Sequence, residues 1–356
     1  MFKLLFVFFL PLQVHARSSS AFDVQILFQG SDVIWGFDFL DAKNLIFTER
    51  LGAMRSINLE NRKVTNLSGV PPVRAKGQGG LLDVRAKDKT RIFFSYSEPI
   101  GDKQTTAIAS AEVSGSNLIK IKKLFSGHEP SSVDIHFGSR IALDYSGHLF
   151  FTMGDRDERD RAQNLEFNNG KVMRLNEDGS IPADNPYVKT KGARPEIWSF
   201  GHRNPQGLVW NRKTKELWEA EFGPRGGDEI NVVKSGKNYG WPIITYGKEY
   251  WGPKIGEGTV KEGIEQPLAY YIPSISPSGI DFYHGDKFSE WNGNLFVANL
   301  SGMHLRRLKI ENQKIISQEE LLKDKKWRFR QVRQGPDEYL YFSTDEGVLG
   351  RLVPKN

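Results

Sequence analysis

The sequence predicts an all-β fold, a six-bladed β-propeller, and three observations carry this prediction. The chain of 356 residues contains 35 glycines and 17 prolines, a composition typical of many short strands joined by turns. Six short runs of aliphatic, β-branched and aromatic residues recur along it, each followed by a turn and a second short strand. Successive runs begin 45 to 78 residues apart. A period of about 45 residues is typical of propeller blades with four strands each.

The six runs are interpreted as the first strand of each repeat, and they occupy 45–48, 92–95, 149–152, 217–220, 295–298 and 340–343. The longer intervals in the middle of the chain indicate insertions. The largest are at 155–200 and 236–280, and we expect them to form loops on the ligand-binding face.

Ring closure is expected to involve both ends of the chain. The strand candidate at 24–28 is predicted to complete the blade formed by the C-terminus, because closing the ring removes exposed sheet edges. No linker divides the chain, so 17–356 is interpreted as one propeller domain. A pair of β-sandwiches is the alternative, although it would not require six matched units.

The N-terminus has the pattern of a secretory signal. Lys3 precedes an apolar stretch at 4–12, and Val14, His15 and Ala16 provide a plausible cleavage site. We therefore expect residues 1–16 to be a cleaved signal peptide and the mature protein to be periplasmic or secreted. About ten apolar residues are too few to cross a bilayer, so no membrane span is expected.

Composition excludes several kinds of chemistry. The chain has no cysteine, which rules out a disulfide framework, a thiolate metal site and a cysteine nucleophile. The net charge of +6 comes from interspersed charges of both signs. A nucleic-acid partner is therefore not expected, whereas a small anionic ligand is compatible with the sequence.

Three segments between the predicted strands carry candidate functional residues. His136, with Asp134 two residues before it, is a candidate general base, although a surface or core histidine has the same pattern. Arg203 and Asn204 stand between a glycine and a proline. Their guanidinium and amide suit a ligand with anionic and carbonyl oxygens, and a polar turn is the alternative.

The third segment, 221–231, contains Gly223 and Pro224 followed by two further glycines. Such a loop can direct backbone carbonyls at a hard cation such as Ca²⁺. Asp228 and Glu229 supply nearby negative charge. A tight loop between strands explains the same residues equally well.

Eight motifs in order give the sequence a resemblance to a known family, the soluble pyrroloquinoline quinone (PQQ)-dependent glucose/sorbosone dehydrogenases, and in particular to their aldose sugar dehydrogenase branch. The motifs are GQGGLLDV at 77–84, HFGSRIALD at 136–144, TMGDR at 152–156, GHRNPQGL at 201–208, EFGPRGGDEIN at 221–231, KNYGWP at 237–242, PSISPSGIDFY at 273–283 and RFRQVRQGPD at 328–337.

This resemblance implies a propeller with PQQ lying over the central channel and an exported quinoprotein that oxidises the C1 hydroxyl of aldoses to lactones. His136 would take the hydroxyl proton while hydride passes to the quinone, and Asp155 would support His136. Gln78 would contact the cofactor region. Arg203 and Asn204 would hold the quinone oxygens and the developing charge. The electron acceptor is not identified by the resemblance.

The resemblance also implies a catalytic Ca²⁺ held by the carbonyls of Gly223 and Pro224 and by the cofactor, where the ion would act as a Lewis acid. Arg328 and Arg330 match an arginine pair that binds the cofactor carboxylates. Their spacing independently predicts that they share one face of a strand, because alternate residues of a strand point the same way.

Three positions depart from the family pattern, and one of them, Glu338 in place of the glycine of a Pro-Asp-Gly turn, is interpreted as structural drift. Ser301 replaces a lysine near the cofactor carboxylates, and Ile272 replaces an aromatic residue above the cofactor, although tyrosines adjoin it. We expect the departure at Ser301 to weaken cofactor binding. A second, structural calcium near Tyr246 and Glu249 is suggested by analogy with some relatives.

Two other functions account for parts of the sequence. A non-catalytic, calcium-binding propeller interaction module would not require His136, Asp155 and the paired arginines together. A calcium-dependent lactonase or hydrolase would require acidic metal ligands, which a Gly-Pro carbonyl site does not provide. The sequence therefore favours the PQQ-dependent aldose sugar dehydrogenase.

Overall fold

The computed structural model describes residues 14–15 and 22–355, which form an almost entirely β structure. The first two blades comprise β3 (Ile34–Phe39), β4 (Asn44–Glu49), β5 (Met54–Asn58) and β6 (Val64–Leu67), then β7 (Leu81–Ala86), β8 (Arg91–Ile100), β9 (Lys103–Ser114) and β10 (Asn117–Ser126). The next two comprise β11 (Ile141–Leu143), β12 (His148–Met153), β13 (Lys171–Asn176) and β14 (Ile197–Phe200), then β15 (Pro205–Asn211), β16 (Glu216–Glu221), β17 (Asp228–Val233) and β18 (Ala269–Tyr271).

The fifth blade comprises β19 (Pro277–Phe282), β20 (Leu295–Asn299), β21 (His304–Glu311) and β22 (Lys314–Leu321). The sixth comprises β23 (Phe329–Gln334), β24 (Leu340–Thr344), β25 (Val348–Pro354) and β2 (Phe22–Gln29). A two-residue strand, β1 (Val14–His15), pairs in parallel with β22. Single 3-10 turns occupy η1 (Arg159–Ala162), η2 (Ser289–Trp291) and η3 (Lys323–Lys325).

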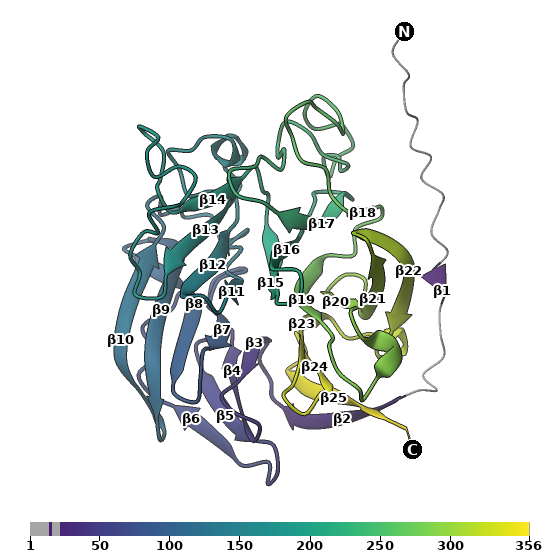
Figure 1. The fold of residues 1–356 in the computed structure, drawn as a ribbon. Helices are drawn as coiled ribbons and strands as arrows, with labels where there is room; N and C mark the ends of the chain where they lie inside the picture. Colours follow the sequence, from purple (N-terminus) through teal and green to yellow (C-terminus); the bar gives the residue numbers. More distant parts are fainter. Residues whose placement is uncertain (1–13, 16–21, 356) are drawn as a thin grey trace.

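These sheets follow one another around a central axis, so the predicted six-bladed propeller is confirmed (Figure 1). The inner strand of each blade contacts the inner strands of its two neighbours, and β23 contacts β3 to complete the ring. The predicted closure is also confirmed, because β2 pairs antiparallel with β25, with Val24 opposite Leu352. The N-terminal strand thus covers an edge that β25 would otherwise expose.

The position of the six hydrophobic runs within the blades was predicted wrongly. Each run lies in the second strand from the centre, such as β4 or β12, and not in the first. The inner strands are harder to recognise because their channel-facing positions are polar, as Asp83 and Arg85 of β7 show. β11 is only three residues long. A strand of that kind lacks the apolar run that marks its neighbour.

The hydrophobic core is divided among the interfaces between blades. Each of the six larger clusters of buried side chains joins residues of two adjacent blades. In one of them Phe22 of β2 lies against Trp291 of the fifth blade, with ring centroids 5.7 Å apart. Blade-to-blade burial therefore stabilises the whole ring, because a blade on its own would leave both faces of its sheet exposed.

Arg140, directly before β11, occupies the central channel and is fully buried. Its side chain contacts one residue from each of the other inner strands: Trp35 of β3, Asp83 of β7, Gln206 of β15, Ser278 of β19 and Arg330 of β23. Nη1 lies 3.1 Å from Oδ1 of Asp83, whose other oxygen accepts the backbone N–H of Ile141. Burial lowers the pKa of Arg140 to about 10, although the charge of Asp83 acts to raise it. The guanidinium is therefore ionised at neutral pH.

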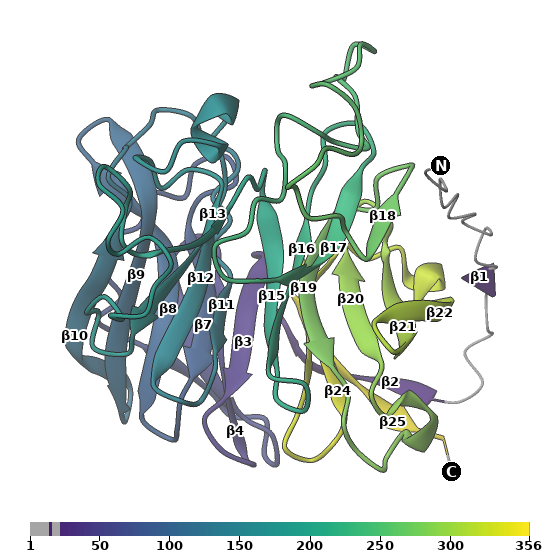
Figure 2. The same ribbon diagram turned by 45° about the horizontal axis from the view of Figure 1, so that its top comes forward.

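Long connections rise above the ring, as Figure 2 shows for the segment between β17 and β18. That segment contains most of the predicted insertion at 236–280. The other insertion, 155–200, contains β13 and β14 as well as two loops. Within residues 14–15 and 22–355 there is no helix long and apolar enough to cross a membrane. The predicted signal peptide at 1–16 lies outside the described residues except for Val14 and His15.

The buried ion pair in the channel gives a stability prediction. Replacing Arg140 with Met leaves the Asp83 carboxylate buried without its partner, which should lower the free energy of unfolding by about 3–5 kcal/mol. Urea unfolding followed by tryptophan fluorescence measures the loss. The double variant Arg140→Met with Asp83→Asn should lose less than the sum of the two single variants. Strictly additive losses would show that the pair does not act as a unit.

Candidate functional site

A buried histidine-aspartate pair lies between two loops of adjacent blades. Nδ1 of His136, from the β10–β11 connection, lies 2.6 Å from Oδ1 of Asp155, which follows β12. His136 is 6% exposed and Asp155 is fully buried. The indole N–H of Trp241 donates to the other carboxylate oxygen of Asp155 at 2.8 Å. A carboxylate on Nδ1 selects the tautomer with that proton, which leaves Nε2 as the acceptor.

Asp155 is the ionised partner of this pair. Burial acts to raise the pKa of its carboxyl, but the hydrogen bond and charge of His136, together with Arg203, hold that pKa below its ordinary value. Asp134, the acid nearest to His136 in the sequence, pairs elsewhere. Its carboxylate instead lies 3.9 Å from the Lys76 ammonium. Trp241 belongs to the predicted insertion at 236–280, and Asp155 belongs to the one at 155–200. Their hydrogen bond shows that the two insertions meet at this site.

The backbone around His136 is held in an uncommon conformation by side-chain carbonyls. His136 has a φ of 55°, and its N–H donates to Oε1 of Gln78 at 2.8 Å. The N–H of Gly138 donates to Oδ1 of Asn204 at 3.1 Å. Gly154 packs against the same loop so closely that a Cβ there would lie 2.2 Å from the His136 carbonyl oxygen. The structure thus brings Gln78 and Asn204 to the His136 loop.

Arg203 and Asn204 lie in the connection from β14 to β15 and are both buried. Nη1 of Arg203 donates to the carbonyls of Phe222 and Gly223 at 3.2 and 2.9 Å. Nδ2 of Asn204 is buried and has no hydrogen-bond partner within the described chain. A buried amide donor without a partner is costly, so it suits a ligand that supplies an acceptor.

Gly223 and Pro224 form a tight buried loop after β16. A Cβ at Gly223 would lie 2.4 Å from the carbonyl carbon of Gly227, so only glycine fits. The loop borders a small cavity, whose lining also includes Glu221, Glu229, Tyr239 and Thr245. The Gly223 carbonyl faces Arg203, which any cation bound to that oxygen would have to share or displace.

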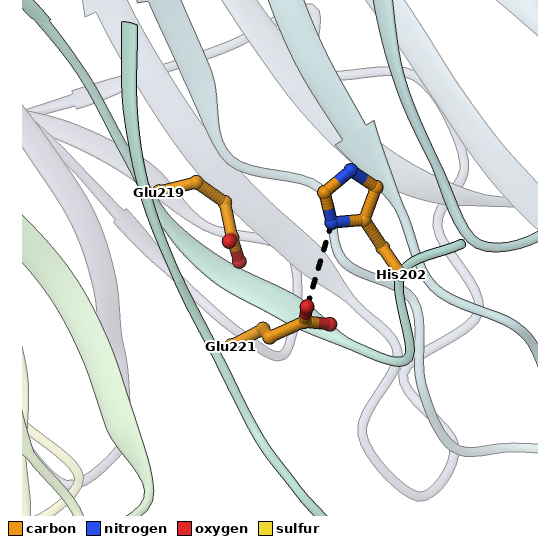
Figure 3. A group of neighbouring side chains, drawn as sticks. All are labelled: His202, Glu219 and Glu221. Atoms are coloured by element: carbon orange, nitrogen blue, oxygen red, sulfur yellow. Dashed lines mark ion pairs between the residues drawn. The ribbon is translucent and has the colours of Figure 1, made fainter. Parts of the chain in front are cut away.

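A buried acidic cluster adjoins this loop (Figure 3). One ligand-type atom each from His202, Glu219 and Glu221 lies within 4.8 Å of the others, and Nδ1 of His202 is 3.5 Å from Oε1 of Glu221. Nδ1 of His202 and Oε1 of Glu219 have no hydrogen-bond partner among the described residues. Burial, and next the charge of Glu221, raises the pKa of Glu219 well above its ordinary value. A divalent cation near these carboxylates would offset their repulsion.

Arg328 and Arg330 converge on one carboxylate. Nε of Arg328 lies 3.0 Å from Oδ2 of Asp345, and Nε of Arg330 lies 2.8 Å from Oδ1. The two guanidiniums share a face, as their spacing predicts, although Arg328 precedes the first residue of β23. Two arginines against one aspartate leave a net positive charge. Burial acts to raise the pKa of Asp345, but the arginines hold it below its ordinary value.

Gln206 connects the arginine pair to the His136 loop, and the sequence did not single it out. Its Oε1 accepts from Nη1 of Arg330 at 3.5 Å, and its Nε2 donates to Oδ1 of Asn204 at 3.3 Å. The residues predicted for catalysis and cofactor binding therefore lie on one face of the ring. Trp241, His202 and Glu219 were also missed, because only their partners distant in sequence reveal their position.

Of the positions that depart from the family pattern, Ser301 is hydrogen-bonded to a neighbouring serine and Ile272 is largely exposed. Ser301 shares a hydrogen bond of 2.8 Å with Ser276. Ile272 is 64% exposed. Of the tyrosines beside it, Tyr271 is buried, and the ring of Tyr270 stacks on Tyr246 with centroids 3.8 Å apart.

The expected second calcium site near Tyr246 and Glu249 is not a cluster of free acids. The carboxylate of Glu249 pairs with Arg159 at 2.5 Å. The carboxylates that the structure does gather lie instead on β16 and β17, at Glu219, Glu221 and Glu229.

The sequence matches the Glucose / Sorbosone dehydrogenase family over residues 31–353, and the chain belongs to this family of oxidoreductases. It is 42% identical over 347 residues to the aldose sugar dehydrogenase YliI of Escherichia coli, covering 94% of this chain and 93% of that one.

Solved structures agree with this assignment. The soluble aldose sugar dehydrogenase of Escherichia coli in its apo-form has a TM-score of 0.90 at 40% identity, over 94% of this chain and all of that one. The PQQ-bound aldose sugar dehydrogenase of Streptomyces coelicolor has a TM-score of 0.77 at 25% identity, over 94% of this chain and 98% of that one.

Trp241 provides a direct test of the site geometry. Trp241→Phe removes the N–H that Asp155 accepts, and a hydrogen bond to a charged group is worth about 1.5–3 kcal/mol. We expect that loss in the free energy of unfolding by urea. Trp251, which is 74% exposed, is the matched control, and Trp251→Phe should change stability by less than about 0.5 kcal/mol. Equal effects would contradict the role given to the indole N–H.

Proposed function

We propose that this protein oxidises the C1 hydroxyl of aldose sugars to lactones, with PQQ as the hydride acceptor and His136 as the general base. The observation that carries the proposal is the His136–Asp155 pair, buried on the same face as the paired arginines and the unpartnered Asn204 amide. Family membership and the PQQ-bound relative from Streptomyces coelicolor support the choice of cofactor.

The residues of this face fit PQQ, which carries three carboxylates. Arg328 and Arg330 keep a net positive charge beside Asp345, and arginine binds carboxylates well because its N–H groups form a planar fork. Nδ2 of Asn204 offers a buried donor for a quinone or carboxylate oxygen. PQQ, when bound, supplies the carbon that accepts the hydride.

His136 and the residues around it would accept the proton of the C1 hydroxyl. His136 would take the C1 hydroxyl proton at Nε2, because Nδ1 is engaged by Asp155. The carboxylate of Asp155 would stabilise the resulting imidazolium. The Trp241 N–H and the backbone N–H of Asp157 keep that carboxylate ionised and in place. Arg203, whose guanidinium lies 5.4 Å from the Trp241 ring centroid, would stabilise negative charge that develops nearby.

Calcium is the metal that we propose for the Gly223–Pro224 loop. Backbone carbonyls suit this hard cation, and it would act as a Lewis acid toward the bound cofactor. The unpartnered carboxylate oxygen of Glu219 and the neighbouring Glu221 supply negative charge on the same side of the loop.

We also propose that residues 1–16 are removed during export to the periplasm or the medium, leaving 17–356 as one catalytic domain. An unidentified carrier would then accept the electrons. N-terminal sequencing of the exported protein checks the cleavage site.

The general base assignment predicts a large loss of turnover in His136→Ala. Loss of a general base costs about 10²–10⁴-fold, and cofactor binding should persist because Arg328 and Arg330, and not His136, are the residues proposed to bind the carboxylates of PQQ. Reduction of a redox dye with glucose as substrate measures turnover. His148, which pairs with Asp144 at 2.7 Å on the same blade, is the matched control. His148→Ala should stay near wild-type activity, whereas more than about a tenth of that activity in His136→Ala would refute the assignment.

Calcium removal gives a second test. Prolonged chelation should abolish both dye reduction and the binding of PQQ measured by calorimetry, and added Ca²⁺ should restore both. A protein that binds Ca²⁺ and PQQ yet reduces no dye with any aldose would support the interaction module instead. Full activity with no metal detected by elemental analysis would exclude the proposed metal.

A further inference from the structure

A second polar cavity, of about 540 Å³, opens at the end of the channel away from His136. All six inner strands contribute to its walls near their C-terminal ends. Its volume lies within the range of small-molecule sites in proteins. Neither the mechanism above nor the calcium site uses any of its residues.

The cavity is separated from the candidate active site along the channel. On β23, Arg330 faces the active-site end and Arg333 lines the second cavity, so about 10 Å of strand lies between them. On β15 the corresponding residues are Gln206 and Asn211. Arg140 and its partners fill the channel between the two ends. A ligand in one end therefore cannot contact the residues of the other.

Cationic groups of the cavity have few partners. Arg333 is 5% exposed, and its guanidinium finds only Asp38, at 3.7 Å, among the described residues. Arg85 shares that carboxylate at 3.3 Å and also reaches the hydroxyl of Tyr145 at 3.4 Å. Arg212 is exposed and lies over the Tyr145 ring, 3.8 Å from its centroid. In both Arg85 and Arg333 it is Nε that faces Asp38, without hydrogen-bond geometry, so no Nη atom of Arg333 has a partner among the described residues.

The acidic groups of the cavity are better satisfied. Asp38 accepts the N–H groups of Phe39 and Ala86 in addition to its arginines. Asp281 accepts the N–H groups of Phe282 and Gln334. Glu338, the third acid of the lining, accepts the N–H of Asp286. The cavity therefore has spare donors on three guanidiniums, and a ligand rich in acceptors would use them.

The other residues that line the cavity suit a ligand that carries hydroxyl groups. Tyr145 and Trp210 present aromatic surface, and the carboxylate of Asp281 can accept a hydroxyl proton. We propose that this cavity binds a small hydroxylated anion, a sugar acid or a sugar phosphate, whose charged group lies between Arg85, Arg212 and Arg333. The proposal does not depend on the reaction at His136.

The test is a calorimetric titration with gluconate and with glucose 6-phosphate, in the presence and absence of PQQ and Ca²⁺. At least one of these anions should bind with a Kd at or below about 1 mM, and glucose should not bind this site. Gluconate and glucose 6-phosphate distinguish the carboxylate from the phosphate as the preferred charged group.

Variants locate the binding. Arg212→Ala should weaken it about ten- to a hundredfold, since one charged hydrogen-bonding group is lost from an exposed position that does not affect folding. Lys213→Ala, which removes the adjacent exposed charge, and Arg328→Ala, at the other end of the channel, should leave the Kd within about twofold.

Two results would overturn the proposal: no binding of either anion, or binding that Arg212→Ala leaves unchanged. If inorganic phosphate binds as tightly as glucose 6-phosphate, the sugar hydroxyls contribute nothing to binding, and the proposal that the ligand is a hydroxylated anion is overturned.

Discussion

The ring is held together at its centre by the guanidinium of Arg140, which contacts residues from all five other inner strands. Burying a charge in this way is costly unless its hydrogen bonds are met, and here Asp83 and backbone carbonyls meet them. The requirement acts on all blades together, because a shift of any one removes a partner of the charge. The contacts of Arg140 therefore constrain the distance of the inner strands from the channel axis and the positions of these strands relative to one another. Both ends of the channel depend on this arrangement.

The candidate active site depends on that register because its residues come from different blades. His136 precedes β11, Asp155 follows β12, Asn204 precedes β15 and Asp345 follows β24. In this propeller the connections into the inner strands and those between the second and third strands open on the same face (Figure 2). Two of the contacts of Arg140, the carbonyls of Gln206 and Arg330, belong to residues of the site. The channel interaction and the site geometry are therefore coupled through the backbone.

Both ends of the channel use the same electrostatic arrangement. At one end Arg328 and Arg330 share Asp345, and at the other Arg85 and Arg333 share Asp38. A single carboxylate keeps two arginines in position and leaves part of their charge for a ligand. The cluster of Glu219, Glu221 and Glu229 is the opposite case, since these buried glutamates exceed their cationic partners among the described residues. Burial raises the pKa values of Glu219 and Glu229. The ring therefore keeps two regions with spare positive charge apart from a region of buried negative charge.

The sequence by itself determined the six repeats and the closure by 24–28, because these are patterns of spacing and residue type. The spacing of Arg328 and Arg330 likewise placed both on one face, whereas Asp155 was predicted from the family motifs alone. The tertiary structure decided which acid orients His136 and that Trp241, 86 residues away in the chain, donates to it. It also decided that the hydrophobic runs are second strands, that Gln206 connects Arg330 to Asn204, and that Glu219 and His202 lie together. Contacts of this kind leave no local pattern, since they arise only when blades far apart in sequence pack around the channel.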